Sequence, residues 1–131
     1  MELERNTEER PLSVQAEFAT LEPIFHHPEI GTSRGVYEQM TEPSFWEVGA
    51  FGRRYSREYA VQTLLERYAA SFQDEWRTEG FYCQELASDL YLLTYTLYQG
   101  PRVTRRVTVW RSAATGWKIV FHHGTVVEAG T

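Results

Sequence analysis

Residues 89–125 read DLYLLTYTLYQGPRVTRRVTVWRSAATGWKIVFHHGT, and this stretch decides the fold. It contains three runs rich in Val, Ile, Thr, Tyr, Phe and Trp, the residue types that are enriched in strands. Gly100-Pro101 and the segment from Ser112 to Gly116 separate these runs with residues typical of turns. The pattern predicts a three-stranded antiparallel meander whose strands, at about ten residues each, exceed the usual ~5–6. Strands of that length allow a sheet to curve around other elements.

The first of these predicted strands has no plainly polar face. Leu90, Leu92 and Tyr98 lie on one face, and Tyr91 and Leu93 lie on the other. An antiparallel sheet with one face in water normally alternates apolar and polar residues. We therefore expect helices of the chain to cover one face and a second copy of the protein to cover the other. The sequence thus predicts a homodimer that forms through the sheet.

A first helix is predicted ahead of the sheet. Ser13 fits its N-cap, and apolar residues from Val14 to Phe25 recur at intervals of three and four. Pro23 removes a backbone donor inside this pattern, so we expect a kink near Glu22 and an end before Pro28.

Further elements follow in a recognisable order. Ser33 and Ser56 fit the N-caps of two more helices, and the last has an apolar stripe from Val61 to Phe72. The segment from Phe45 to Tyr55 predicts a short hairpin, and Glu75 to Ala87 predicts a fourth long strand. Helices first and most of the sheet afterwards indicate an α+β fold with helices on one face of a curved antiparallel sheet.

Length and composition narrow the class of protein. The chain of 131 residues suits one domain, which we place at 12–131 after a mobile acidic arm over 1–11. A net charge of -5 without any long basic block argues against nucleic-acid binding. The single cysteine, Cys83, and the charged N-terminus without an apolar run predict a cytoplasmic protein with no membrane association.

Four short motifs carry a resemblance to a known superfamily. They are Leu21-Glu22, Phe45-Trp46-Glu47-Val48-Gly49 with Gly52-Arg53 after it, Arg106-Val107-Thr108-Val109-Trp110, and Trp117-Lys118-Ile119-Val120-Phe121-His122-His123-Gly124-Thr125. With them the chain resembles the nuclear transport factor 2-like superfamily, which includes ketosteroid isomerase and polyketide cyclases. More closely it is similar to an uncharacterised bacterial branch related to SnoaL-like proteins and to the association domain of calcium/calmodulin-dependent kinase II.

The resemblance implies a cone: a curved sheet wrapped around N-terminal helices, with a pocket at its open end and dimers formed through the sheet. It does not imply a reaction, because no catalytic motif of the superfamily's enzymes aligns with this chain. Three functions stay open. The first is a module that binds a small, partly apolar molecule in the cone, the second is an isomerase, dehydratase or cyclase, and the third is an assembly domain without a ligand.

Glu47 and His122 are the candidate catalytic residues. If Glu47 points inward with Phe45, its carboxylate needs a partner, because an unpaired buried charge is costly. Arg53, Arg106 and His122 are the candidate partners. A Glu47–His122 pair could transfer protons as general base and acid, or it could be a structural hydrogen-bond network that fixes the hairpin against the sheet.

The candidate ligand-binding residues combine aromatic rings with a few polar groups. They are Trp46, Glu47, Tyr55, Tyr95, Arg106, Thr108, Trp110 and His122. Adjacent histidines on a strand face opposite ways, so neither His122-His123 nor any other pair has the spacing of a metal site. A phosphate-binding glycine loop is also missing from the sequence. We therefore expect neither a metal nor a cofactor.

Overall fold

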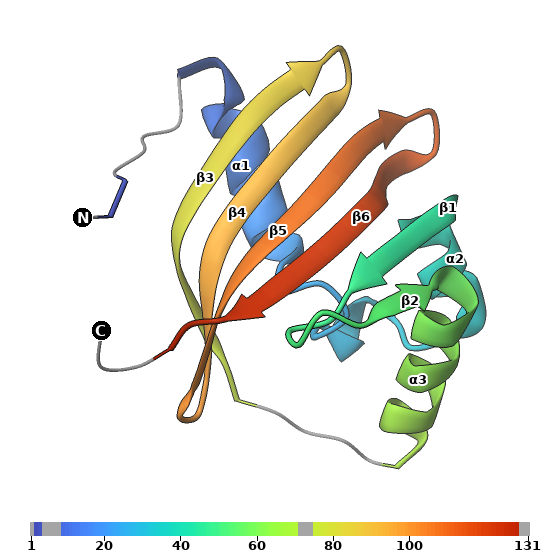
Figure 1. The fold of residues 1–131 in the computed structure, drawn as a ribbon. Coiled ribbons are helices and arrows are strands. Elements are labelled where there is room, and N and C mark those ends of the chain that lie inside the picture. The colour runs from blue at the N-terminus through green and yellow to red at the C-terminus, as the bar shows by residue number, and fades with distance from the viewer. Residues whose placement is uncertain (1, 4–8, 71–74, 129–131) are drawn as a thin grey trace.

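The computed structural model describes residues 2–3, 9–70 and 75–128. The helices in these ranges are α1 (Glu9–Leu21), α2 (Arg34–Met40) and α3 (Arg57–Ala69), with a 3-10 turn η1 (Pro28–Ile30) (Figure 1). The strands are β1 (Thr41–Val48), β2 (Arg54–Ser56), β3 (Arg77–Ala87), β4 (Leu90–Gln99), β5 (Arg102–Ala113) and β6 (Gly116–Val126). The predicted α+β fold with a curved sheet is confirmed.

One sheet contains all of these strands, in the order β2-β1-β6-β5-β4-β3. Neighbours are antiparallel except β1 and β6, which run parallel. The predicted meander is β4, β5 and β6, and the predicted hairpin is β1 and β2. Figure 1 shows the long strands bending, with α1 behind them and α3 beside β1 and β2 at the other end. The inner face of the sheet is the one that meets these helices.

The first helix differs from its prediction at both ends. It begins at Glu9, so Ser13 lies inside it and is not its N-cap, and it ends at Leu21 without a kink at Glu22. Pro23 explains the early end, because the residue before a proline is disfavoured in helical geometry. Of the arm predicted over 1–11, residues 1 and 4–8 lie outside the described residues. Glu2 forms an ion pair with Arg105 at 3.1 Å.

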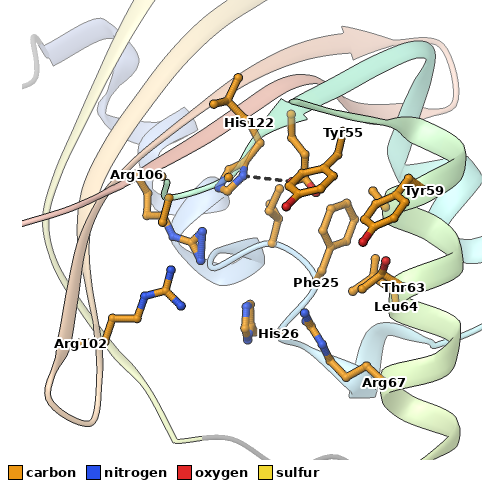
Figure 2. A pocket seen from close by; sticks show the side chains of 17 residues that line it. Phe25, His26, Tyr55, Tyr59, Thr63, Leu64, Arg67, Arg102, Arg106 and His122 are labelled. Carbon is orange, nitrogen blue, oxygen red and sulfur yellow. Dashed lines mark ion pairs between the residues drawn. The ribbon is translucent and has the colours of Figure 1, made fainter. Parts of the chain in front are cut away.

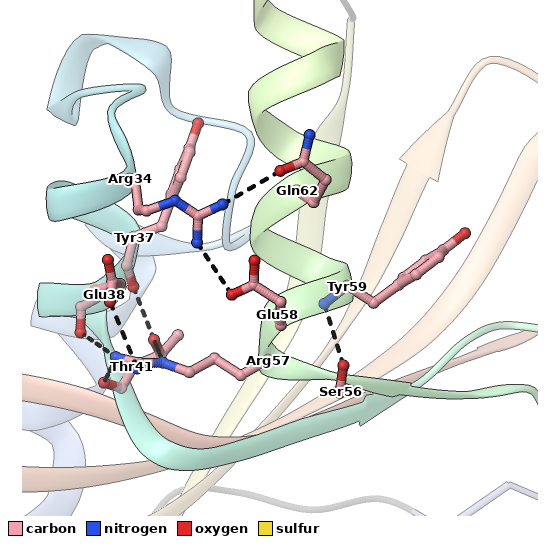
Figure 3. Close-up of polar contacts among 9 residues, drawn as sticks. All are labelled: Arg34, Tyr37, Glu38, Thr41, Ser56, Arg57, Glu58, Tyr59 and Gln62. Carbon is pink, nitrogen blue, oxygen red and sulfur yellow. Dashed lines mark hydrogen bonds and ion pairs between the residues drawn. The ribbon is translucent and has the colours of Figure 1, made fainter.

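The caps of the other two helices are confirmed. The Ser33 side chain accepts a hydrogen bond from the Val36 backbone at 3.2 Å. Ser56 accepts one from the Tyr59 backbone at 3.1 Å, as Figure 3 shows. Each cap satisfies a backbone donor that the first turn of a helix leaves unpaired. Phe72, the end of the predicted stripe of α3, lies outside the described residues. No helix in the described part of the chain is long and apolar enough to cross a membrane.

Aromatic rings form the core between α1 and the sheet. The rings of Phe18 and Trp110 stack with centroids 5.0 Å apart, and Trp117 meets Phe18 edge-on at 4.8 Å. Leu93 and Ile119 are fully buried beside them. This end of the cone is therefore packed solid, and any internal space must lie at the other end.

The outer face of the sheet carries a continuous apolar row. Leu92, Val109, Phe121 and Trp46 are register partners on the consecutive strands β4, β5, β6 and β1. The Trp46 and Phe121 rings touch, with centroids 4.6 Å apart, and Trp46 is 45% exposed. No helix of the described chain packs on this row, so the sheet presents apolar side chains on both of its faces.

Candidate functional site

A cavity of about 290 Å³ opens at the end of the cone away from Trp110. The inner sides of β1, β5 and β6 form one wall, α3 forms the opposite wall, and the segment from Ile24 to His26 lies between them (Figure 2). Small-molecule sites commonly have volumes of about 300–1,000 Å³. The cavity therefore suits a compact molecule.

Glu47 and His122 lie together on the sheet side of this cavity. They are register partners on the parallel strands β1 and β6, so both side chains emerge on the inner face. The His122 Nδ1 atom lies 3.4 Å from Glu47 Oε2, which is long for a hydrogen bond but within ion-pair range. The structure thus brings together the two residues that the sequence paired.

Burial controls the charge of His122. The residue is 5% exposed, and neither ring nitrogen has a full hydrogen bond within the described chain. Burial lowers the pKa of His122 below its ordinary value, and the contact with Glu47 opposes that shift. The imidazole is therefore neutral at neutral pH, with one nitrogen able to donate and the other to accept.

Arg106 reaches the cavity because of a glycine on the next strand. Arg106 is the register partner of Gly124, and a Cβ atom built on Gly124 would lie 2.8 Å from the Arg106 Cδ atom. Only a residue without a side chain lets the arginine lie across β6. Burial lowers the pKa of Arg106, yet a guanidinium stays protonated in proteins. The Arg106 guanidinium therefore places a positive charge in the cavity wall.

Three more basic residues line the cavity, and none was among the residues proposed from the sequence. Arg102 extends from β5, Arg67 from α3, and His26 from the segment after α1 (Figure 2). Arg102 had a usable signal, because it lies four residues before Arg106 and so shares its face of the strand. Nothing local in the sequence placed Arg67 or His26 opposite that strand.

Aromatic rings form the remaining part of the cavity wall. The Tyr55 and Tyr59 rings stack with centroids 4.8 Å apart and an interplanar angle of 12°. Phe25 lies further in, held in a left-handed backbone conformation with φ of 67° that is uncommon for a large side chain. Tyr55 is one of the predicted ligand-binding residues, and it does line the cavity together with Glu47, Arg106 and His122.

A second polar centre, missed from the sequence, lies inside the core. The Glu22 carboxylate is fully buried and accepts hydrogen bonds from Tyr95 Oη at 2.7 Å, from Trp110 Nε1 at 3.0 Å and from the Ile24 backbone N–H at 3.1 Å. Burial, followed by the negative charge of Glu22, raises the pKa of Tyr95 well above its usual value. The available signal was a glutamate that continues an apolar helical stripe just before Pro23.

The other predicted ligand-binding residues lie away from the cavity. Tyr95 and Trp110 contact Glu22, Thr108 is fully buried on β5, and Trp46 faces outward. They are not among the residues that line the cavity. Within residues 2–3, 9–70 and 75–128, no three His, Cys, Asp or Glu side chains come close enough together to hold a metal ion.

Comparison with solved structures finds many chains of the same architecture. A candidate dehydratase of the nuclear transport factor 2-like family from Streptomyces avermitilis is 14% identical, with a TM-score of 0.69 over 91% of this chain and 99% of that one. An uncharacterised protein with a cystatin-like fold from Caulobacter vibrioides is 14% identical, with a TM-score of 0.67 over 86% and 88%. A candidate ketosteroid isomerase from Parabacteroides distasonis is also 14% identical, with a TM-score of 0.64 over 96% and 98%.

These similarities establish the fold. The chain has the cone-shaped nuclear transport factor 2-like, or cystatin-like, architecture that its sequence motifs resemble. No protein-family model matches the chain. No curated protein matches it either. At this level of identity the function has to be argued from the cavity itself.

Proposed function

We propose that this protein is a homodimeric binding module that holds a small, partly apolar molecule in the cavity of the cone. The single observation that carries the proposal is the wall itself. Stacked Tyr55 and Tyr59 offer apolar surface on one side, and Glu47, Arg106 and His122 offer polar groups on the other. Binding sites combine apolar walls with a few placed polar groups in this way.

The open cavity argues against an assembly domain without a ligand. In such a domain we would expect the protein's own Trp and Tyr side chains to fill the cone. Here Trp110 and Trp117 fill only the far end, around Phe18. About 290 Å³ remains unfilled beside Tyr55 and His122.

Filling the cavity should abolish binding. Thr63 lines the cavity from α3, so we expect Thr63→Trp to place an indole where a ligand would lie. Isothermal titration with naphthoate and its neutral analogue naphthamide should give saturable binding to the unaltered protein. The variant should weaken binding at least about 100-fold, which corresponds to roughly 2.7 kcal/mol.

The neighbouring residue provides a matched control. Gln62 lies on the exposed side of α3, where it contacts Arg34 (Figure 3). It also contacts Glu66. Gln62→Trp should therefore leave probe binding unchanged. Failure of both probes to bind, or equal binding to the Thr63→Trp and Gln62→Trp variants, would contradict the proposed function.

The Glu47–His122 pair favours an enzyme as the second candidate. A carboxylate and a neutral imidazole in a sheltered cavity are the groups that isomerases and dehydratases use to move protons. With a β,γ-unsaturated cyclohexenone as substrate, the enzyme would produce the conjugated ketone, which is followed by its ultraviolet absorbance. Glu47→Gln should then lower the rate by about 10²–10⁴-fold.

The exposed Glu58 at the start of α3 is the control for this test. Glu58→Gln should retain the full rate while Glu47→Gln loses it, with both variants keeping the circular-dichroism spectrum of the folded protein. Equal rates in the two variants would sink the proton-transfer role of Glu47. The Glu47–His122 contact would then be a structural network between β1 and β6.

The dimer is proposed on the outer face of the sheet. The apolar row of Leu92, Val109, Phe121 and Trp46 crosses four neighbouring strands. A second copy that packs by the same row would bury it on both sides, because a twofold interface matches a surface to itself. Burial of such a surface is favourable at roughly 25 cal/mol per Å² of apolar area.

A further inference from the structure

We propose that the molecule bound in the cavity is an oxyanion, a carboxylate or a phosphate ester, whose charged group lies between Arg67 and the pair Arg102 and Arg106. The inference rests on the proposed binding function and specifies the chemical class of the ligand. The apolar body of the ligand would lie against Tyr55 and Tyr59.

The charge of the cavity wall is one-sided. Arg67, Arg102 and Arg106 line it and carry positive charge, whereas the neutral His122 adds none. Glu47 is the sole acidic side chain among the lining residues of the described chain, and it is engaged with His122. A protein whose overall charge is -5 has therefore gathered positive charge at this place. Fields in such a cleft attract anions.

The basic groups come from opposite walls and converge. Figure 2 shows Arg102 and Arg106 extending from the sheet side and Arg67 from α3 toward the same space, with His26 between them. Arg102 is exposed at the mouth, and Arg106 lies deeper, behind Gly124. Guanidinium groups on two walls can hold an oxyanion from both sides with charge-assisted hydrogen bonds.

One buried donor in the wall has no partner of its own. The Arg106 Nε–H group is buried and makes no hydrogen bond within the described chain. A buried donor without a partner costs free energy. Burial first, and the nearby charge of Arg102 as a smaller effect, lower the pKa of Arg106. A bound oxyanion would supply acceptors and offset the repulsion between the two arginines.

The apolar part of the wall limits the rest of the ligand. The Tyr55 and Tyr59 rings stack on each other, and Phe25 and Leu64 line the cavity further in. A cavity of about 290 Å³ that already holds a charged group leaves room for one or two rings or a short branched chain. The favoured class is therefore an aromatic or small aliphatic acid, or the corresponding phosphate ester.

Titration calorimetry with three naphthalene probes tests the proposal. Naphthoate and naphthyl phosphate carry the oxyanion, and naphthamide has nearly the shape of naphthoate without its charge. We expect at least one anion to bind about tenfold or more tightly than naphthamide, a difference of roughly 1.4 kcal/mol. The tighter of the two anions identifies the head group as a carboxylate or a phosphate. Added salt should weaken the binding of the two anions and leave the binding of naphthamide unchanged.

Variants then locate the charged group. Arg102→Gln and Arg67→Gln should each weaken anion binding about tenfold, the effect of one lost charge-assisted contact, and should leave naphthamide binding unchanged. Arg111→Gln is the matched control. Arg111 is on the same strand as Arg102 but pairs with Glu42 at 2.5 Å at the far end of the sheet, so its loss should alter no probe.

The possible results distinguish a failure of the oxyanion proposal from a failure of the proposed binding function. Naphthamide binding that equals anion binding, and that Thr63→Trp blocks, would overturn the oxyanion and keep the binding module. Arg111→Gln and Arg102→Gln could also weaken anion binding equally. That result would overturn the oxyanion proposal, because the attraction would then not depend on the arginines of the cavity. If none of the three probes binds, both proposals fall.

Discussion

Replacing Glu22 with alanine is expected to lower the free energy of unfolding by about 3–5 kcal/mol, the range for removing a large buried side chain whose partners are left unpaired. The carboxylate accepts hydrogen bonds from Tyr95, Trp110 and the Ile24 backbone, all inside the core. None of these donors can reach water after the substitution, since both side chains are at most 2% exposed. The variant would also leave a cavity beside the Phe18 ring.

Glu22 holds three parts of the chain together. It follows α1 directly, Tyr95 belongs to β4 and Trp110 to β5, so the hydrogen bonds tie the end of the helix to the middle of the sheet. The carboxylate also holds the Ile24 backbone N–H at 3.1 Å, just after α1. Loss of this hydrogen bond should loosen the segment from Ile24 to His26, which lines the cavity.

Urea unfolding followed by tryptophan fluorescence measures this effect. Glu17→Ala is the control, because Glu17 is an exposed glutamate of the same helix, and surface substitutions usually change stability by less than about 0.5 kcal/mol. Glu22→Gln should fall between the two, since an amide keeps the shape and one acceptor but adds donors where donors already converge. A Glu22→Ala variant as stable as Glu17→Ala would show that the network contributes nothing.

Phe121→Arg is expected to convert the proposed dimer to a monomer. Phe121 lies within the apolar row of the outer face, between Val109 and Trp46. In a twofold dimer each substitution occurs twice, so two guanidinium groups would enter one interface. Burying unpaired charge is costly, and we expect the dissociation constant to rise at least about 1,000-fold, or roughly 4 kcal/mol.

Sedimentation velocity at micromolar concentration checks this prediction. Ile30→Arg is the control, because Ile30 is 41% exposed in η1, outside the sheet. It should leave the dimer intact. Both variants should fold, since the Phe121 side chain points away from the core. Circular dichroism checks that they do. An unaltered protein that sediments as a monomer, or a Phe121→Arg variant that stays dimeric, would remove the outer-face dimer.

Local patterns in the sequence were sufficient for most of the fold. The turn residues at Gly100-Pro101 and the strand-forming runs around them predicted β4, β5 and β6, and Ser33 and Ser56 marked the starts of α2 and α3 correctly. The predicted start of α1 was wrong. Ser13 has the side chain of an N-cap residue, yet the helix begins at Glu9 and continues through Ser13. Capping is a local preference of about 1 kcal/mol, which packing can override.

The candidate site was also predicted only in part. Alternation along β1 puts Glu47 on the same face as Phe45, and alternation along β5 puts Arg106 on the same face as Thr108 and Trp110, because side chains on a strand point to opposite faces in turn. That these faces point inward was a hypothesis. Glu47 and Arg106, with Tyr55 and His122, line the cavity. Trp46 does not, because it lies on the outer face of the sheet. Tyr95, Thr108 and Trp110 do not either, since the sequence could not say which end of the cone is open.

The sequence by itself determined the class of fold and the order of its elements, because both follow from the chemistry of neighbouring residues. The tertiary structure alone decided what lies opposite what. Glu22 meets Trp110 across 88 positions of the chain, and Arg67 faces Arg102 only because α3 and β5 form opposite walls of one cavity. Such contacts depend on how distant segments pack, and no local pattern records that packing.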